Sequence, residues 1–214
     1  MQNPAEIVDY ECPDGGVLMW DMAGTLIPFD PVTGTPGPLP GCDEFLPELG
    51  RDFRQVVTTG DERDSARGLL SGFGLAGHFE EIYGDLFAPV GKPFGEILRH
   101  LGGSPCCSMA IGDRLRSDVA SDTDGVVTLL INQNGDVATA GAVTLVLRSL
   151  LRKARDFPTA FDRLSQEWQA APDLVGERSG GQITRASAGD LGFPCRLLRF
   201  EHPVLDGDRM IVQI

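Results

Sequence analysis

Positive charge, and lysine above all, is scarce in this chain of 214 residues. Lysine occurs only as Lys92 and Lys153, and Lys and Arg together number 18 against 31 Asp and Glu, which gives a formal net charge of −13. Such a chain has no basic surplus to neutralise a phosphate backbone, so nucleic acid is excluded as a general partner. The same scarcity makes the position of each lysine informative.

Long apolar runs and patterned cysteines are also missing. No run approaches the roughly 18 apolar residues of a membrane span, and no charged-then-apolar leader precedes the first expected strand. The five cysteines, which include the adjacent pair Cys106 and Cys107, are scattered without the spacing of a zinc site or a disulfide framework. We therefore expect a cytoplasmic protein with reduced thiols and no membrane partner.

The chain contains enough apolar residues, 42%, to build a core for one domain with an appendage. Short apolar runs alternate with amphipathic segments, and this alternation favours a parallel, doubly wound α/β sheet. Strands are expected over 17–21, 56–59, 82–83, 109–113 and 126–131, and helices over 42–49, 62–71, after Lys92, 147–157 and 159–170. Residues 1–170 would form this core domain.

Residues 171–214 are expected to form a small β-rich extension, with strands over 182–186, 196–200 and 210–214. Two or three strands alone are marginally stable, so the extension should pack on the core or on another subunit. The extension could be a structural tail without a role in the reaction. Two functional interpretations stay open: it could cover the open site, or it could form a homodimer contact.

Four short motifs carry the chemistry. The first is the run from Trp20 to Leu26, in which Asp21 ends a buried strand, and the second is the run from Gln55 to Gly60. The third, Gly91-Lys92-Pro93, opens a helix, and the fourth runs from Met109 to Asp118 with acids at Asp113 and Asp118. Ligands bind at the carboxyl ends of strands in open α/β sheets, so these residues are expected to meet there.

The order of these motifs over residues 15–150 resembles the haloacid dehalogenase superfamily of phosphohydrolases. The resemblance implies a three-layer α/β/α Rossmann-like fold and a Mg²⁺-dependent phosphatase acting through an aspartyl-phosphate. It implies that Asp21 is the nucleophile, that Thr58 binds a phosphate oxygen and that Lys92 places positive charge beside both. The metal ligands would be the carboxylates of Asp21 and Asp113 and the main-chain carbonyl of Ala23.

Further residues of the motifs have supporting roles in this resemblance. Asp118 would support the metal site or hold Lys92 in place, although Asp122 is a close rival. Phosphate or substrate contacts are expected from Gly24, Thr25, Thr59 and Arg114. The partner would be a small phosphorylated substrate, or a larger phosphorylated molecule, because no segment is long enough for a cap domain and the site should be open.

Ala23 departs from the family pattern. Most phosphatases of this family carry a second Asp there, which protonates the leaving group and activates water, a contribution of typically 10²–10⁴-fold. The chain could act on substrates whose leaving group needs no proton, or another acid could substitute, for instance Asp30, Asp43 or Glu44. The third interpretation is a catalytically inactive domain that binds a phosphorylated ligand or a protein partner.

Two other activities of the family are disfavoured. Phosphonate-cleaving members share the Asp-x-Ala-Gly-Thr pattern, but they use a lysine of an inserted cap, and no lysine lies between Asp21 and Lys92. Dehalogenating members carry an aromatic residue at the position of Ala23 and need no Mg²⁺. We therefore expect a phosphatase whose activity is reduced or narrowed by Ala23.

Overall fold

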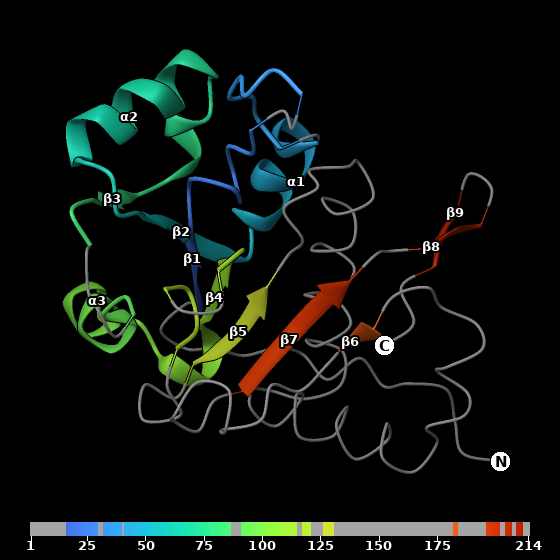
Figure 1. The fold of residues 1–214 in the computed structure, drawn as a ribbon. Coiled ribbons are helices and arrows are strands. Elements are labelled where there is room, and N and C mark those ends of the chain that lie inside the picture. The colour runs from blue at the N-terminus through green and yellow to red at the C-terminus, as the bar shows by residue number, and fades with distance from the viewer. Residues whose placement is uncertain are drawn as a thin grey trace, which may run out of the picture.

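The structure is a computed structural model (Figure 1). It describes residues 16–29, 32–39, 41–86, 91–114, 117–120 and 126–130, together with the backbone of four strands between 182 and 211. The helices expected over 147–157 and 159–170, Asp30 and Asp122 lie outside the described residues.

A seven-stranded sheet in the order β3-β2-β1-β4-β5-β7-β6 forms the centre of the fold. Every neighbouring pair from β3 to β7 is parallel, and only β6 runs antiparallel, against β7. A separate hairpin pairs β8 with β9. The strands are β1 (Gly16–Trp20), β2 (Phe53–Thr58), β3 (Glu81–Tyr83), β4 (Met109–Gly112), β5 (Val127–Leu130), β6 (Gln182–Ile183), β7 (Arg196–Glu201), β8 (Val204–Asp206) and β9 (Arg209–Ile211).

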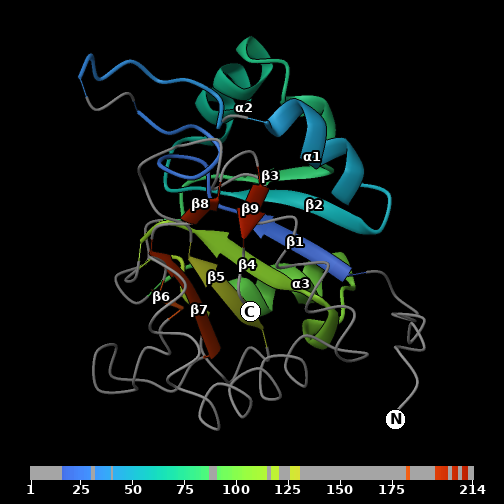
Figure 2. The same ribbon diagram turned by 90° about the vertical axis from the view of Figure 1, so that its right-hand side faces the viewer.

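Helices cover both faces of this sheet, which gives three layers. Helices α1 (Cys42–Leu49) and α2 (Arg63–Gly72) lie on one face and α3 (Phe94–Leu101) lies on the other (Figure 2). Short 3₁₀ helices, η1 (Ala76–His78) and η2 (Pro105–Cys107), precede β3 and β4. A parallel sheet requires such crossover connections, because consecutive parallel strands cannot be joined by a tight turn.

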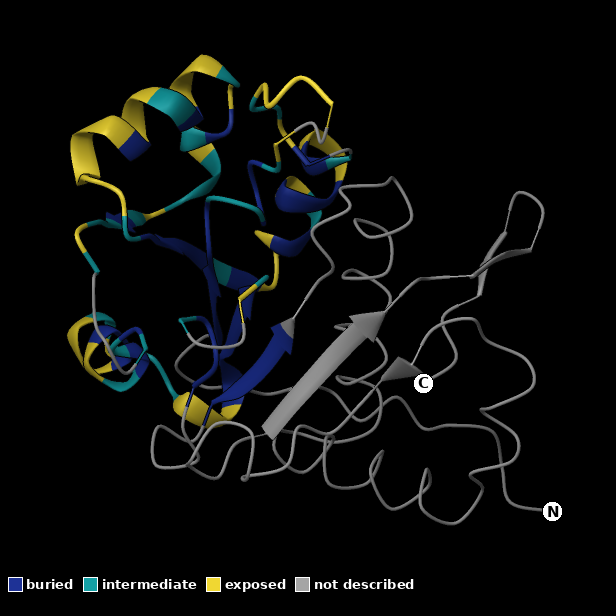
Figure 3. Ribbon diagram, viewed as in Figure 1, coloured by how far each residue is buried: buried dark blue, intermediate teal, exposed yellow. Residues whose placement is uncertain are grey.

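Strand β1 has the continuous apolar sequence of a strand buried on both faces. Leu18 and Trp20 pack in the cluster that includes α1 and α2, whereas Val17 and Met19 pack in the cluster that includes α3. All five residues of β1 are buried, and the buried part of the sheet is visible as one dark layer in Figure 3. This strand therefore fixes the position of whatever follows it at its carboxyl end.

The fold class expected from the sequence is confirmed, and the strands of the core lie within a few residues of their expected bounds. Strand β7 pairs in parallel with β5, which attaches part of the expected C-terminal extension to the main sheet. The division of the chain at residue 170 stays a prediction.

Two further expectations concern the cysteines and the membrane. The expectation of reduced thiols is wrong for Cys107, which is disulfide-bonded, whereas Cys42 and Cys106 are free. Scattered cysteines give no pairing signal in sequence, because a pairing depends on which chain segments the fold brings together. Among the described residues, no helix has both the length and the apolar character needed to span a bilayer.

Candidate active site

The motif residues meet at the carboxyl edge of the sheet, where three neighbouring strands end. Asp21 follows β1, Thr58 closes β2, and Asp113 follows β4, which pairs with β1 on the side opposite to β2. The backbone N–H of Asp21 donates to the carbonyl of Ile111 at 2.7 Å, so the sheet ladder continues to this residue and fixes its position. Residues of three of the four motifs therefore lie at the same edge of the sheet.

Three carboxylates gather at this edge. Oxygen atoms of Asp21, Asp113 and Asp118 lie within 4.8 Å of one another. The side chain of Asp113 is fully buried, and those of Asp118 and Asp21 are 2% and 10% exposed. Acidic groups packed so closely in a buried place repel each other unless a cation lies among them.

Lys92 supplies one such cation. Its Nζ lies 2.5 Å from Oδ1 of Asp21 and 2.7 Å from Oδ1 of Asp118, with only 3% of the side chain exposed. Its backbone N–H donates to the carbonyl of Ser117 at 3.1 Å, which ties the start of the α3 segment to the fourth motif. The third motif thus places a buried ammonium between the first and the fourth.

Asp118 organises the loop that carries Asp113. Its Oδ2 accepts hydrogen bonds from the backbone N–H groups of Asp113, at 3.2 Å, and Arg114, at 2.9 Å. A Cβ at Gly112 would lie 2.3 Å from the Cβ of Asp118, so only glycine permits this close approach. Asp118 therefore contacts both Lys92 and the backbone that carries Asp113, whereas its role in supporting a metal site stays a prediction.

Gly24 and Thr25 complete the wall of the carboxylate cluster. Gly24 has φ +91°, a backbone conformation that favours glycine, and a Cβ there would lie 2.4 Å from Oδ2 of Asp113. The hydroxyl of buried Thr25 lies 3.2 Å from Oδ2 of Asp21 and 3.4 Å from Oδ1 of Asp113. Gly24 thus allows its backbone to pack directly against the Asp113 carboxylate, and Thr25 hydrogen-bonds to the carboxylates of Asp21 and Asp113.

The other expected contact residues have different surroundings. The buried hydroxyl of Thr58 donates to the carbonyl of Trp20 at 3.3 Å, and the buried hydroxyl of Thr59 donates to Oδ2 of Asp61 at 3.1 Å. The side chain of Arg114 is 66% exposed, with its Nε 4.0 Å from Oδ2 of Asp113. Their contacts with a substrate stay predictions.

The electrostatics of the cluster act most strongly on Asp21. Burial raises the pKa of the Asp21 carboxyl from 3.8 to about 7; the ammonium of Lys92 opposes this rise, and the neighbouring charges of Asp118 and Asp113 add to it. Loss of hydration disfavours the charged carboxylate, and in this cluster one lysine does not compensate for it. A second cation near Asp21 would favour the ionised form.

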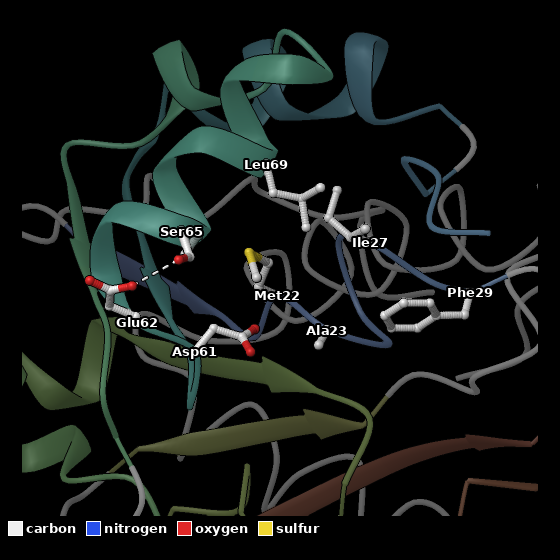
Figure 4. A pocket seen from close by; sticks show the side chains of 9 residues that line it. Met22, Ala23, Ile27, Phe29, Asp61, Glu62, Ser65 and Leu69 are labelled. Carbon is white, nitrogen blue, oxygen red and sulfur yellow. Dashed lines mark hydrogen bonds between the residues drawn. The ribbon is translucent and has the colours of Figure 1, made fainter. Parts of the chain in front are cut away.

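An apolar cavity of about 350 Å³ is lined in part by the chain segment that directly follows Asp21 (Figure 4). Met22 and Ala23, the two residues after Asp21, form one part of its wall. Its acidic lining residues are Asp61 and Glu62 on the segment that enters α2, not the Asp43 and Glu44 considered from the sequence, which are exposed in the first turn of α1. Sequence reasoning missed Asp61: its position three residues after Thr58 places it near a strand end, but the sequence does not show the direction of its side chain.

Comparison with known proteins agrees with this arrangement. Residues 31–121 match the family model described as haloacid dehalogenase-like hydrolase, a segment that contains Thr58, Lys92, Asp113 and Asp118 and begins after Asp21. A search of curated proteins found no significant match.

Among solved structures, the chain is similar to one described as a predicted phosphatase from Clostridium acetobutylicum, with 16% identity, coverage of 64% of this chain and 98% of that one, and a TM-score of 0.50. It is also similar to the haloacid dehalogenase-like family protein SP0104 from Streptococcus pneumoniae, with 16% identity, 60% and 90% coverage and a TM-score of 0.45. A third similarity is to the HAD-hydrolase YfnB from Bacillus subtilis bound to magnesium, with 17% identity, 50% and 54% coverage and a TM-score of 0.41. Residues 31–121, less than half of the chain, are thus similar to haloacid dehalogenase-like hydrolases, and they lie in the parallel sheet described above.

Proposed function

We propose that the protein is a Mg²⁺-dependent phosphatase that acts through an aspartyl-phosphate at Asp21. The observation that carries this proposal is the buried contact of Lys92 with both Asp21 and Asp118, 2.5 and 2.7 Å away, beside the third carboxylate of Asp113. Phosphoryl transfer depends chiefly on positioning and on charge stabilisation, and these groups provide both for a phosphate at the edge of the sheet.

The donor set fits Mg²⁺. Mg²⁺ prefers oxygen ligands, binds through one or two carboxylates and keeps several waters, and three carboxylates lie here within 4.8 Å of one another. Asp21, Asp113 and the main-chain carbonyl of Ala23 would hold the ion, and Asp118 would keep Lys92 and the Asp113 loop in place. When bound, Mg²⁺ supplies the positive charge that neutralises phosphate oxygens.

Asp21, Lys92 and Thr25 have separate roles in the proposed reaction. A carboxylate oxygen of Asp21 attacks phosphorus, and the bond between phosphorus and the leaving oxygen breaks as the aspartyl-phosphate forms. Lys92 orients the attacking carboxylate, and Thr25 restrains its second oxygen, Oδ2. Water then attacks the aspartyl-phosphate, which releases phosphate and restores Asp21.

Ala23 narrows this activity rather than removing the site. A methyl group cannot protonate a leaving oxygen, but the role proposed for this residue in metal binding needs only its carbonyl. We therefore propose that the protein turns over acyl phosphates readily, and that it turns over phosphate esters only as far as a residue other than Ala23 supplies the proton. We also propose that the site lacks an inserted cap, so that it admits a small phosphorylated molecule or a larger one. A homodimer is a further proposal.

The second candidate function is a non-catalytic module that binds a phosphorylated ligand or a protein in the same place. The observation that favours it is the replacement of the family's usual acid/base group by Ala23. Such a module would bind phosphate beside the buried acids without turning it over.

Phosphate release from acetyl phosphate and from phenyl phosphate, each measured with Mg²⁺, separates the two functions. Release from acetyl phosphate that disappears in Asp21→Asn and after metal chelation would support the phosphatase. Asp64→Asn is the matched control, because Asp64 is an exposed acid in the first turn of α2. If a folded, Mg²⁺-binding wild-type protein releases no phosphate above the Asp21→Asn background, the proposed phosphatase is wrong and the binding module replaces it.

A further inference from the structure

The cavity beside Ala23 is placed to receive the part of a substrate that leaves after phosphoryl transfer. Ala23 and Met22 directly follow Asp21 in the chain and form one side of the cavity. Ile27 and Phe29 extend that side, and Leu69 of α2 lies across from it (Figure 4). Because Met22 and Ala23 directly follow Asp21, a phosphate held at Asp21 would lie near this wall of the cavity.

The lining of the cavity is mostly apolar. Met22, Ile27, Ala66 and Leu69 present aliphatic or thioether groups, and Phe29 adds a ring that is 52% exposed at the mouth. A surface of this kind favours aryl or alkyl groups, since burying them removes apolar area from water. It offers few partners for the hydroxyl groups of a sugar.

Asp61 is the acid directed into this cavity. Its carboxylate points toward the side on which Ala23 lies, whereas Glu62 turns away and accepts a hydrogen bond from Ser65 at 2.9 Å (Figure 4). Asp61 therefore presents a carboxyl group in the cavity to which Ala23 contributes only a methyl group.

The backbone around Asp61 holds this carboxyl in place. Oδ2 accepts from the hydroxyl of Thr59 at 3.1 Å, and the same hydroxyl accepts from the Asp61 backbone N–H at 3.2 Å. The Asp61 carbonyl accepts from the N–H of Asp85 at 2.8 Å. Within the described part of the chain, Oδ1 has no hydrogen-bond partner, so one oxygen is anchored and the other is available to a ligand.

We propose that this cavity binds the leaving group of an aryl or alkyl phosphate monoester and that Asp61 is the general acid and base that Ala23 does not provide. The inference rests on the proposed phosphatase function. In the first step Asp21 attacks phosphorus, the P–O bond to the leaving group breaks, and protonated Asp61 transfers its proton to the leaving oxygen. In the second step the Asp61 carboxylate takes a proton from the attacking water, phosphate departs and Asp21 is restored.

The test compares Asp61→Asn with the wild-type protein on two substrates, with Mg²⁺ present. Phenyl phosphate releases phenol, whose acidity is close to that of a tyrosine side chain, with a pKa of about 10, so its departure benefits from a proton. Acetyl phosphate releases a carboxylate, which departs without one. We expect kcat/KM to fall about 10²-fold or more on phenyl phosphate and to stay within about threefold on acetyl phosphate, with Asp64→Asn unchanged on both.

A purely structural role of Asp61 would reduce both activities together. Equal losses on the two substrates, or an unchanged rate on phenyl phosphate, would overturn the role of Asp61 and leave the phosphatase standing. Failure of the wild-type protein on both substrates would overturn the phosphatase and this inference with it.

Two further measurements test the same role of Asp61, and the second uses only the wild-type protein, so it does not depend on the folding of Asp61→Asn. Adding Ala23→Asp to that variant should restore at least tenfold of the lost activity on phenyl phosphate, because the new carboxyl faces the same cavity. In the wild-type protein, rates on substituted phenyl phosphates should depend only weakly on leaving-group acidity when the leaving oxygen is protonated. A steep fall with rising leaving-group pKa would contradict acid catalysis.

Discussion

Replacing Asp21 with asparagine should stabilise the metal-free protein, and the gain should grow with pH. In the folded protein burial raises the pKa of the Asp21 carboxyl from 3.8 to about 7, despite the opposing charge of Lys92 2.5 Å away. In the unfolded chain the same carboxyl returns to its ordinary value. On folding, Asp21 therefore either takes up a proton or is buried as an ionised carboxylate, which is less stable there than it is in water.

The sign and size follow from linkage. Because the folded pKa is raised, the stabilising contribution of the neutral carboxyl is fully present below about pH 3.8 and is lost as pH rises through 7. At about 1.36 kcal/mol per pH unit, the rise from 3.8 to about 7 corresponds to a loss on the order of 4 kcal/mol. Asparagine remains neutral throughout, so its advantage should increase by about 2–3 kcal/mol between pH 5 and pH 8.

Urea unfolding at pH 5 and pH 8 in the presence of EDTA measures this change. The comparison between two pH values cancels any constant difference between an amide and a neutral carboxyl, and Asp64→Asn corrects for loss of an exposed acid. An advantage that is equal at both pH values, or that reverses at pH 8, would refute the reasoning, because Lys92 would then outweigh the burial of Asp21.

Three other predictions test the same cluster. Lys92→Met should lower the free energy of unfolding at pH 8 by about 3–5 kcal/mol, because the Asp21 and Asp118 carboxylates would lose their shared cation; urea unfolding measures it, and a loss below 1 kcal/mol would contradict it. Mg²⁺ at 100 times its dissociation constant should stabilise the wild-type protein by about 2.7 kcal/mol, and Asp113→Asn should remove most of this gain in a thermal unfolding assay. Gly24→Ala should weaken Mg²⁺ affinity at least tenfold by calorimetry, since its Cβ would lie 2.4 Å from Oδ2 of Asp113 and its backbone has φ +91°; unchanged affinity would show that the Asp113 loop shifts freely.

Much of the core could be predicted from the sequence because its elements are marked locally. Strands β1 and β4 are short apolar runs that end at an acid, and both ends place that acid at the carboxyl edge of the sheet. Helix α1 has the predicted bounds, Cys42–Leu49, because apolar residues recur on one face after the turn that ends at Gly41. The order of the motifs along the chain and their positions next to predicted strands and a predicted helix were enough to predict that Asp21, Lys92 and Asp113 meet.

The features that could not be predicted depend on contacts between distant segments. The pairing of β5 with β7 joins residues 127–130 to 196–199, and nothing in the mixed sequence of β7 specifies which sheet edge it joins. The cavity beside Ala23 likewise needs α2 to be packed across from Ile27 before it exists. Asp61 was therefore missed, because its direction is set by Thr59 and by that packing rather than by a motif.

The net charge of the carboxylate cluster explains both why ionised Asp21 destabilises the metal-free fold and why phosphate binding there requires a cation. Ionised Asp21, Asp113 and Asp118 carry three negative charges and Lys92 carries one positive charge, which leaves two negative charges in a buried place. A phosphate dianion would be repelled there, and Lys92 cannot counter it freely because two carboxylates already surround its ammonium. One divalent cation brings the balance to zero, favours the ionised form of Asp21 that nucleophilic attack needs, and offsets the cost of burying it. On this argument the fold tolerates a destabilising carboxylate at the end of β1 because ion and substrate together relieve it.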